Sequence, residues 1–147
     1  MEIERKYLVK NLPDNLESYE QKHIAQGYLC TNPVLRIRRS NDEYFLTYKG
    51  QGLMAREEHE FPISEEAFEH LLHKVDGVLI NKIRYKIPLD EKYTAELDVF
   101  QGVHTPLCLV EVEFESIEDA ESFVAPDWFG DDVTHSGEYH NSRLSQR

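Results

Sequence analysis

The sequence predicts an α+β protein built on a closed antiparallel barrel of eight strands, with a charged interior and helices packed outside. Apolar and charged residues alternate with a period of two over much of the chain, which is typical of strands with two unlike faces. The polar positions of these strands are almost purely Arg, Lys, Glu and Asp, whereas a solvated face usually mixes in Ser, Thr, Gln and Asn. The chain has 147 residues, enough for one domain, which we expect to span residues 1–147.

Seven segments show this alternation clearly. The strands are expected at residues 2–9, 34–39, 43–49, 56–63, 82–87, 95–99 and 110–115, with a weaker eighth strand near Gln26–Cys30. The glycines at 50 and 52 indicate a hairpin turn.

Helices are expected between the strands and at the C-terminal end. One helix is predicted to begin at Ser64, an N-cap residue followed by two glutamates that suit the helix dipole. A shorter helix is predicted at Ile117–Val124, and a last helical turn from about Asn141. Residues 11–23 stay ambiguous between a loop and a helix around Leu16–Tyr19.

The signs of the charges are grouped by strand. The basic pairs are Arg36/Arg38 and Lys82/Arg84, and the acidic pairs are Glu2/Glu4, Glu96/Asp98 and Glu111/Glu113. Like charges along one strand face repel unless opposite charges lie between them. A barrel with its charged faces inward brings the two signs together and leaves the apolar faces for helices to cover. The alternative is an open sheet whose charged face lies in water.

Such an interior predicts a site for a metal–polyphosphate complex. Facing carboxylates suit Mg²⁺ or Mn²⁺. Arginine and lysine pairs suit phosphate oxygens.

Composition restricts the partners. The net charge of −12 argues against nucleic acid, whose phosphate backbone is bound by basic surfaces. No apolar run approaches the roughly 20 residues that span a bilayer. The opening MEIERKYLV has no apolar segment typical of a signal peptide. We therefore expect a cytoplasmic protein with no membrane or nucleic-acid partner.

Short motifs occur in a characteristic order along the whole chain. MEIERK contains E-x-E-x-K, and the motifs that follow are QGYL at Gln26–Leu29, LRIRR at Leu35–Arg39, LTYKG at Leu46–Gly50, R-x-E-x-E at Arg56–Glu60, NKIRY at Asn81–Tyr85, ELDVFQG at Glu96–Gly102, LVEVEF at Leu109–Phe114 and WFGDDVT at Trp128–Thr134. With this ordered set the chain resembles the CYTH, or triphosphate tunnel metalloenzyme, superfamily. It is most similar to the compact bacterial members, which include inorganic triphosphatases.

The resemblance implies a role for each matching residue. The implied metal ligands are Glu2, Glu4, Glu111 and Glu113, with Asp98 or Glu96 helping. The implied phosphate-binding residues are Arg36, Arg38, Lys49, Lys82 and Arg84, with Arg56 assisting. Lys6 and Tyr28 are implied as a catalytic dyad that activates the attacking water, although Tyr28 could also be an ordinary packed tyrosine. His135 stands where similar sequences often have an acidic residue, which leaves the role of that segment open.

The expected activity is metal-dependent hydrolysis of inorganic triphosphate to diphosphate and phosphate, with Mg²⁺ or Mn²⁺ and direct attack by water. Two alternatives stay open. The same fold could serve as a class IV-type adenylate cyclase or as a thiamine or nucleoside triphosphatase, or the protein could bind polyphosphate without catalysis. We expect a monomer or a homodimer.

Overall fold

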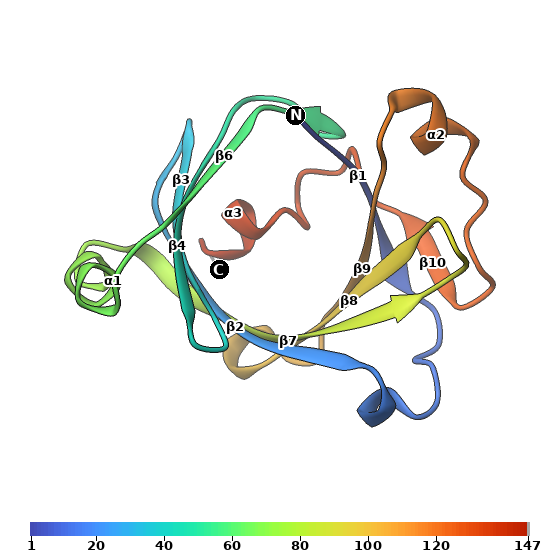
Figure 1. Cartoon of the computed structure of the whole chain (residues 1–147), viewed down its shortest axis with the longest axis horizontal. Coiled ribbons are helices and arrows are strands. Elements are labelled where there is room, and N and C mark those ends of the chain that lie inside the picture. Colours follow the sequence, from blue (N-terminus) through green and yellow to red (C-terminus); the bar gives the residue numbers. More distant parts are fainter. Residues whose placement is uncertain (147) are drawn as a thin grey trace.

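The computed structural model describes residues 1–146, whose strands form a single antiparallel sheet that curls into a barrel (Figure 1). The strand order is β10-β1-β9-β8-β7-β2-β3-β4-β6, and the short strand β5 pairs with β1 in addition. The strands are β1 (Glu2–Val9), β2 (Glu20–Thr31), β3 (Val34–Ser40), β4 (Glu43–Lys49), β5 (Ala55–Arg56), β6 (Glu58–Pro62), β7 (Asp76–Pro88), β8 (Thr94–Phe100), β9 (Cys108–Glu113) and β10 (Phe129–Asp132).

The barrel closes where β5 meets the first half of β1. Glu2 pairs with Arg56 in this short ladder, and the backbone N–H of Glu4 donates to the carbonyl of Met54 at 3.0 Å. Only Glu57 separates β5 from β6, so the two pieces act as one interrupted strand and complete a ring of eight. The expected barrel is confirmed. The second half of β1 pairs with β10, an additional strand that we did not predict.

The strands β2 and β7 are longer than the sequence pattern indicates. They pair from Glu20↔Lys86 to Tyr28↔Asp76, so β2 takes up the end of the ambiguous segment, residues 20–23. A 3₁₀ turn, η1 (Leu16–Ser18), precedes β2. Pairing between distant segments decides these boundaries, because local alternation is weak in both extensions.

Two helices cover apolar outer faces of the barrel, as expected. On one side, α1 (Glu65–Leu72) packs against β3 and β4, where the rings of Phe68 and Tyr44 lie 5.1 Å apart. On the other side, α2 (Ile117–Ser122) packs against β1, and its buried Ala120 lies in the same cluster as Leu97 and Val112. This cluster is the larger apolar core, and Phe123 and Trp128, which follow α2 in the chain, pack against it.

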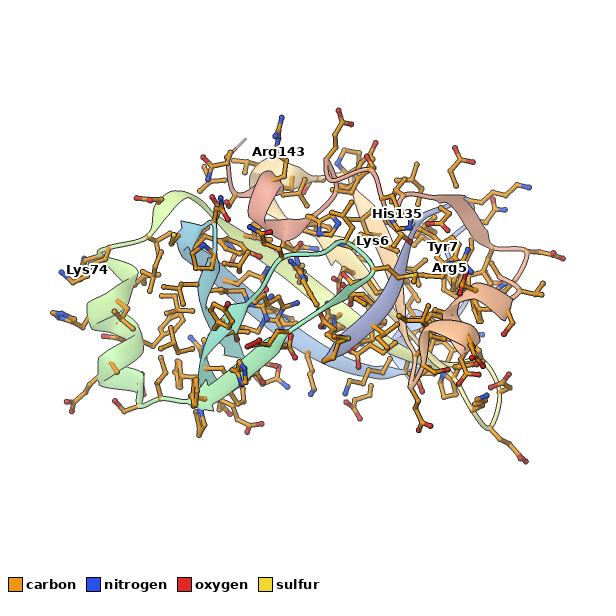
Figure 2. All side chains as sticks on the ribbon, turned by 90° about the horizontal axis from the view of Figure 1, so that it is seen from above. Arg5, Lys6, Tyr7, Lys74, His135 and Arg143 are labelled. Atoms are coloured by element: carbon orange, nitrogen blue, oxygen red, sulfur yellow. The ribbon has the colours of Figure 1, made fainter. Side chains whose placement is uncertain are left out.

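The third helix, α3 (Asn141–Leu144), lies across one end of the barrel (Figures 1 and 2). Its Leu144 packs with Tyr28, Ile80 and Phe100, which form a small apolar cluster inside this end. The backbone N–H of Val78 donates to the carbonyl of Ser145 at 2.6 Å and ties the segment down. Of the three α-helices in the described residues, α1 and α2 therefore pack on the outer wall and α3 does not. None of the helices within residues 1–146 has the length and apolar character needed to cross a bilayer.

Candidate active site

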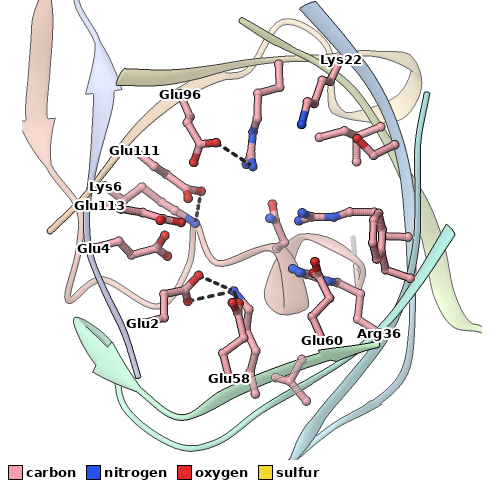
Figure 3. A pocket seen from close by; sticks show the side chains of 18 of the residues that line it. Glu2, Glu4, Lys6, Lys22, Arg36, Glu58, Glu60, Glu96, Glu111 and Glu113 are labelled. Atoms are coloured by element: carbon pink, nitrogen blue, oxygen red, sulfur yellow. Dashed lines mark hydrogen bonds and ion pairs between the residues drawn. The ribbon is translucent and has the colours of Figure 1, made fainter. Parts of the chain in front are cut away.

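Inward-pointing side chains of the barrel line a cavity of about 240 Å³, called the lumen below (Figure 3). Arg36 and Glu111 are only 3% and 6% exposed, so these charges do not lie in bulk water. Their apolar neighbours Ile37 and Val112 are buried on the outer faces, and the open-sheet alternative is therefore wrong. The lumen contains most of the residues predicted for the site: Glu2, Glu4, Lys6, Tyr28, Arg36, Arg38, Lys49, Arg56, Arg84, Glu111 and Glu113.

Glu2, Glu4 and Glu113 form a carboxylate cluster on the wall made by β1 and β9. Glu4 and Glu113 face each other in the ladder between these strands, and one oxygen from each of the three residues lies within 4.8 Å of the others. Burial, together with the charges of Glu111 and Glu2, raises the pKa of Glu4 well above its ordinary value. Burial and the nearby Glu96 and Glu2 raise the pKa of Glu113 to about 7. Like charges converge here without enough opposite charge.

This carboxylate cluster fits a divalent cation. Mg²⁺ and Mn²⁺ prefer oxygen ligands, and a double positive charge would relieve the repulsion that raises the two pKa values. Mg²⁺ usually keeps part of its shell for water and substrate phosphate, and a cluster that faces a polar lumen allows this. Glu2, Glu4 and Glu113 are therefore the residues that could hold a metal.

Two lysines form ion pairs with carboxylates of the same wall. Lys49 Nζ lies 2.9 Å from Glu2 Oε1, and Lys6 Nζ lies 3.4 Å from Glu111 Oε1. Burial alone would raise the pKa of both carboxyl groups. Neighbouring cations together outweigh burial: Lys49 lowers the pKa of Glu2, and Lys6, Arg84 and Lys82 lower that of Glu111 well below its usual range. Glu111 thus lies beside the carboxylate cluster but forms an ion pair with Lys6.

Basic residues lie on the opposite wall, where Figure 3 shows Arg36 and Lys22 across the lumen from Glu4, Glu111 and Glu113, with Glu60 beside Arg36. Burial, followed by the charges of Arg36 and Arg84, lowers the pKa of Arg38 to about 10. Burial and the neighbouring Lys86 lower the pKa of Lys22. Arg36 Nε is buried and has no hydrogen-bond partner within the part of the chain that the structure describes. An anion in the lumen would satisfy this donor and offset the repulsion.

Lys82 and Asp98 are not among the residues that line the lumen. Asp98 is 1% exposed and accepts two hydrogen bonds from Arg84, at 2.7 Å from Nε and 2.9 Å from Nη2. Lys82 Nζ lies 2.8 Å from the same carboxylate. Burial would raise the pKa of Asp98, but these two cations keep it low. Burial lowers the pKa of Lys82 to about 7. The structure thus places both residues behind Arg84, away from the carboxylate cluster.

Lys6 and Tyr28 both line the lumen, but the structure gives them different partners. Lys6 Nζ donates to the carbonyl of Tyr139 at 3.0 Å, and Tyr28 Oη accepts from Gln26 Nε2 at 3.4 Å. The ladders of β2 shift register on both sides of Tyr28, between Gln26 and Tyr28 on the β7 side and between Tyr28 and Cys30 on the β3 side. Such bulges are common beside active sites, where they re-aim a side chain.

The segment around His135 anchors Lys6. His135 itself is exposed, whereas its neighbour Thr134 is buried and accepts a hydrogen bond from the backbone N–H of Lys6 at 2.9 Å. Figure 2 shows Lys6 and His135 near the same end of the barrel.

The lumen also holds polar residues that the sequence analysis did not assign to the site: Lys22, Ser40, Glu43, Glu58, Glu60, Lys86 and Asn141. Lys86 lies two residues after Arg84 and therefore on the same inward face, so the alternation in the sequence could have predicted it. Lys22 lies in the segment that stayed ambiguous. Asn141 comes from α3, whose place at the barrel end no local pattern predicts.

Fold and lumen together define a class of protein: an antiparallel β-tunnel in which a wall of carboxylates faces a wall of arginines and lysines. The family model of the CYTH domain matches residues 1–145, and the chain belongs to this family.

Relatives with named activities match over nearly the whole chain. An inorganic triphosphatase of Nitrosomonas europaea is 42% identical over 147 residues, covering 98% of this chain and 96% of the relative. An inorganic triphosphatase of Acetivibrio thermocellus is 35% identical over 151 residues, with 97% and 92% covered.

Solved structures show the same fold. The crystal structure of the inorganic triphosphatase NE1496 is similar with a TM-score of 0.74 and 39% identity, covering 100% of this chain and 95% of that one. The PH1819 protein from Pyrococcus horikoshii OT3 shares the fold alone, with a TM-score of 0.52, 24% identity and 82% of each chain covered.

Proposed function

We propose that this protein is a metal-dependent triphosphatase that hydrolyses inorganic triphosphate to diphosphate and phosphate in the lumen. The observation that carries the proposal is the buried Arg36, whose Nε lacks a partner among the described residues and which faces the carboxylate cluster across the cavity. A ligand that satisfies both walls must present anionic oxygens to the arginines and a cation to the glutamates. A metal–triphosphate complex does both, and the named activity of the relatives supports this choice.

The size of the lumen favours a small inorganic substrate. Pockets for organic ligands commonly have volumes of about 300–1,000 Å³. The lumen measures about 240 Å³ and is lined mainly by charged side chains. An inorganic triphosphate is bound by charged groups along its length and has no apolar part, which matches this charged lining.

The proposed metal ligands are Glu2, Glu4 and Glu113, with Glu111 adding negative charge beside them. Held there, Mg²⁺ or Mn²⁺ would supply positive charge that neutralises the phosphoryl oxygens. Asp98 is proposed to orient Arg84 instead of binding metal, and Lys82 to act through Asp98.

The chain's own residues would bind the substrate and activate the water. Arg36, Arg38, Arg84 and Lys49 would hold the phosphate oxygens in a fixed geometry, with Arg56 assisting. Water would attack the terminal phosphorus in line, the bond to the bridging oxygen would break, and diphosphate would leave. Tyr28 Oη is proposed to accept the proton of the attacking water, and the ammonium of Lys6 adds positive charge to the lumen.

We further propose that residues 1–147 form one domain. The family match over residues 1–145 and the continuous sheet support this, although Arg147 lies outside the described residues.

A second cavity supports a second candidate, the hydrolysis of an organic triphosphate. It measures about 540 Å³ beside α3 and shares Val34 and Arg56 with the lumen. Its lining includes Pro33 and Leu53, which suit an organic group, and Arg143. A thiamine or nucleoside triphosphate could place its phosphates in the lumen and its organic part here.

A substrate panel tests these proposals. Phosphate release is measured from tripolyphosphate, ATP and thiamine triphosphate at equal concentration, with Mg²⁺ or Mn²⁺. We expect tripolyphosphate to give the highest kcat/KM and Glu4→Gln to abolish metal-dependent turnover. Preference for ATP or thiamine triphosphate would favour the second candidate. Tight binding of tripolyphosphate with no turnover in any metal would make the protein a binding module.

A further inference from the structure

Gln26 stands between the proposed base and a proposed phosphate-binding residue. It lies on β2, points into the barrel and is 0% exposed. Its Oε1 accepts a hydrogen bond from Arg38 Nε at 2.9 Å, and its Nε2 donates to Tyr28 Oη at 3.4 Å. We infer that Gln26 is a positioning residue for hydrolysis, which orients Tyr28 and links it to Arg38. This inference rests on the proposed function.

The chemistry of the two neighbours determines which way the amide points. Arginine has only donors, so the oxygen of Gln26 must face Arg38. The amide nitrogen then faces Tyr28, and because this nitrogen only donates, the tyrosine oxygen must accept. The hydroxyl hydrogen of Tyr28 is thereby directed away from Gln26. The amide therefore fixes the position of the Tyr28 oxygen without engaging its hydrogen.

The surrounding backbone supports this arrangement. The bulge between Gln26 and Tyr28 changes the register of β2 against β7 at this point. The glycine between them allows Val75 to approach closely, because a Cβ at Gly27 would come within 2.7 Å of both Val75 methyl groups. The segment is therefore held closely against its outer neighbour. The distance of 3.4 Å is at the long end for a hydrogen bond, and catalytic hydrogen bonds often shorten when substrate binds.

The link to Arg38 connects substrate binding with the base. Arg38 is held through its Nε, which leaves its terminal nitrogens for phosphate oxygens. A phosphate bound by Arg38 would therefore lie at a fixed position relative to Tyr28 Oη.

A double-mutant cycle on tripolyphosphate hydrolysis with Mg²⁺ tests the inference. The variants are Gln26→Met, Tyr28→Phe and the double variant, with kcat and KM measured for each. Gln26→Met removes both hydrogen bonds at nearly constant volume. We expect it to lower kcat about tenfold or more in the wild-type background. In the Tyr28→Phe background the same change should alter kcat less than about twofold. An increase of KM caused by the loosened Arg38 should persist in both backgrounds.

Two further variants complete the design. Gln101→Met makes the same substitution at an exposed position outside the lumen and should leave kcat and KM unchanged. If Gln26→Met does not fold, Gln26→Glu replaces it, since a carboxylate still accepts from Arg38 but cannot donate to Tyr28 when ionised. We expect kcat to fall in this variant as well.

Other outcomes overturn the inference. It fails if Gln26→Met leaves kcat unchanged, or if the loss is the same with and without the Tyr28 hydroxyl. Absence of phosphate release by the wild type would instead refute the proposed function. Nitrogen–proton NMR spectra then test the contact between Gln26 and Tyr28 without relying on activity. The side-chain amide signal of Gln26 is identified by its loss in Gln26→Met, and it should shift in Tyr28→Phe. An unchanged signal would refute the contact itself.

Discussion

Lys49 Nζ lies 2.9 Å from Glu2 Oε1, so the last residue of β4 is bound to the first residue of β1 next to the point where the barrel closes. Glu2 also belongs to the carboxylate cluster, and Lys49 is a proposed phosphate ligand. The same carboxylate can therefore be neutralised by the lysine or by a metal. Metal bound at Glu2 would free Lys49 for the phosphate, which makes the two binding events cooperative.

Lys49→Met should uncouple these events. Without the lysine, Glu2 keeps its ion pair with Arg56 Nε at 3.7 Å but loses its main cationic partner, so Mg²⁺ should bind the substrate-free variant more tightly than it binds the wild type. The kcat/KM for tripolyphosphate should fall about tenfold or more, because a charged contact to phosphate is lost. Calorimetric titration with Mg²⁺ and steady-state kinetics measure the two effects. Lys10→Met, at an exposed lysine after β1, is the matched control. Weaker Mg²⁺ binding by Lys49→Met would contradict the competition.

The carboxylate cluster should contribute less to the stability of the metal-free protein as pH rises from about 5 to 8, whereas the lowered pKa values of His140, about 4, and Lys82, about 7, act in the opposite direction. The pKa of Glu113 is raised from 4.5 to about 7, so the folded state holds a proton that the unfolded state has lost. This contribution is fully present below pH 4.5 and is lost as pH rises through about 7, and Glu4 shifts in the same direction. Glu113 is solvent-exposed, so screening limits the size of the effect.

Melting curves across this pH range, with and without Mg²⁺, measure that loss. Because metal binds the deprotonated carboxylates, Mg²⁺ should raise the Tm more at pH 8 than at pH 5.5. Glu113→Gln should remove the contribution of Glu113, which is the difference between the pH profiles of the wild type and this variant without metal. A Mg²⁺ effect that is largest at acidic pH would show that the metal is not held by this cluster.

Asp98→Ala should destabilise the protein by about 3–5 kcal/mol, because it leaves buried cations without their partner. Arg84 and Lys82 both lie within 2.9 Å of this carboxylate. Urea unfolding measures the change in the free energy of unfolding. Glu20→Gln breaks the exposed pair between Glu20 and Lys86, which are 3.7 Å apart, and should cost less than about 1 kcal/mol. Equal losses in the two variants would mean that the buried triad contributes no more than a surface pair.

Arg36 and Arg39 offer a comparison within one strand. Arg36 points into the lumen, whereas Arg39 is exposed and donates to the carbonyl of Asn41. Arg36→Met should lower kcat/KM for tripolyphosphate about 10- to 100-fold, as expected for a lost charged hydrogen bond. Arg39→Met removes the same charge from the outer face and should change kcat/KM less than about twofold. Similar losses in both variants would indicate an effect of net charge and not of the lumen.

The sequence by itself determined which face of each strand is charged and that these faces point inward. Alternation with a period of two is a local property, because successive side chains leave a strand on opposite sides. The order of residues alone therefore predicts that Arg36 shares a face with Arg38, and Glu111 with Glu113. The grouping of these charges by sign likewise predicts the barrel that encloses them.

Only the tertiary structure decided which charges meet. Asp98 and Glu113 have the same period and the same sign in the sequence, yet Asp98 binds Arg84 and Lys82 while Glu113 joins the carboxylate cluster. Gln26 could not be distinguished from any other buried strand residue until its two partners were placed. Strand order, register and bulges determine these contacts, and they depend on segments far apart in the chain. The physical reason is that the direction of a side chain is set locally, whereas its partner is set by the closure of the whole sheet.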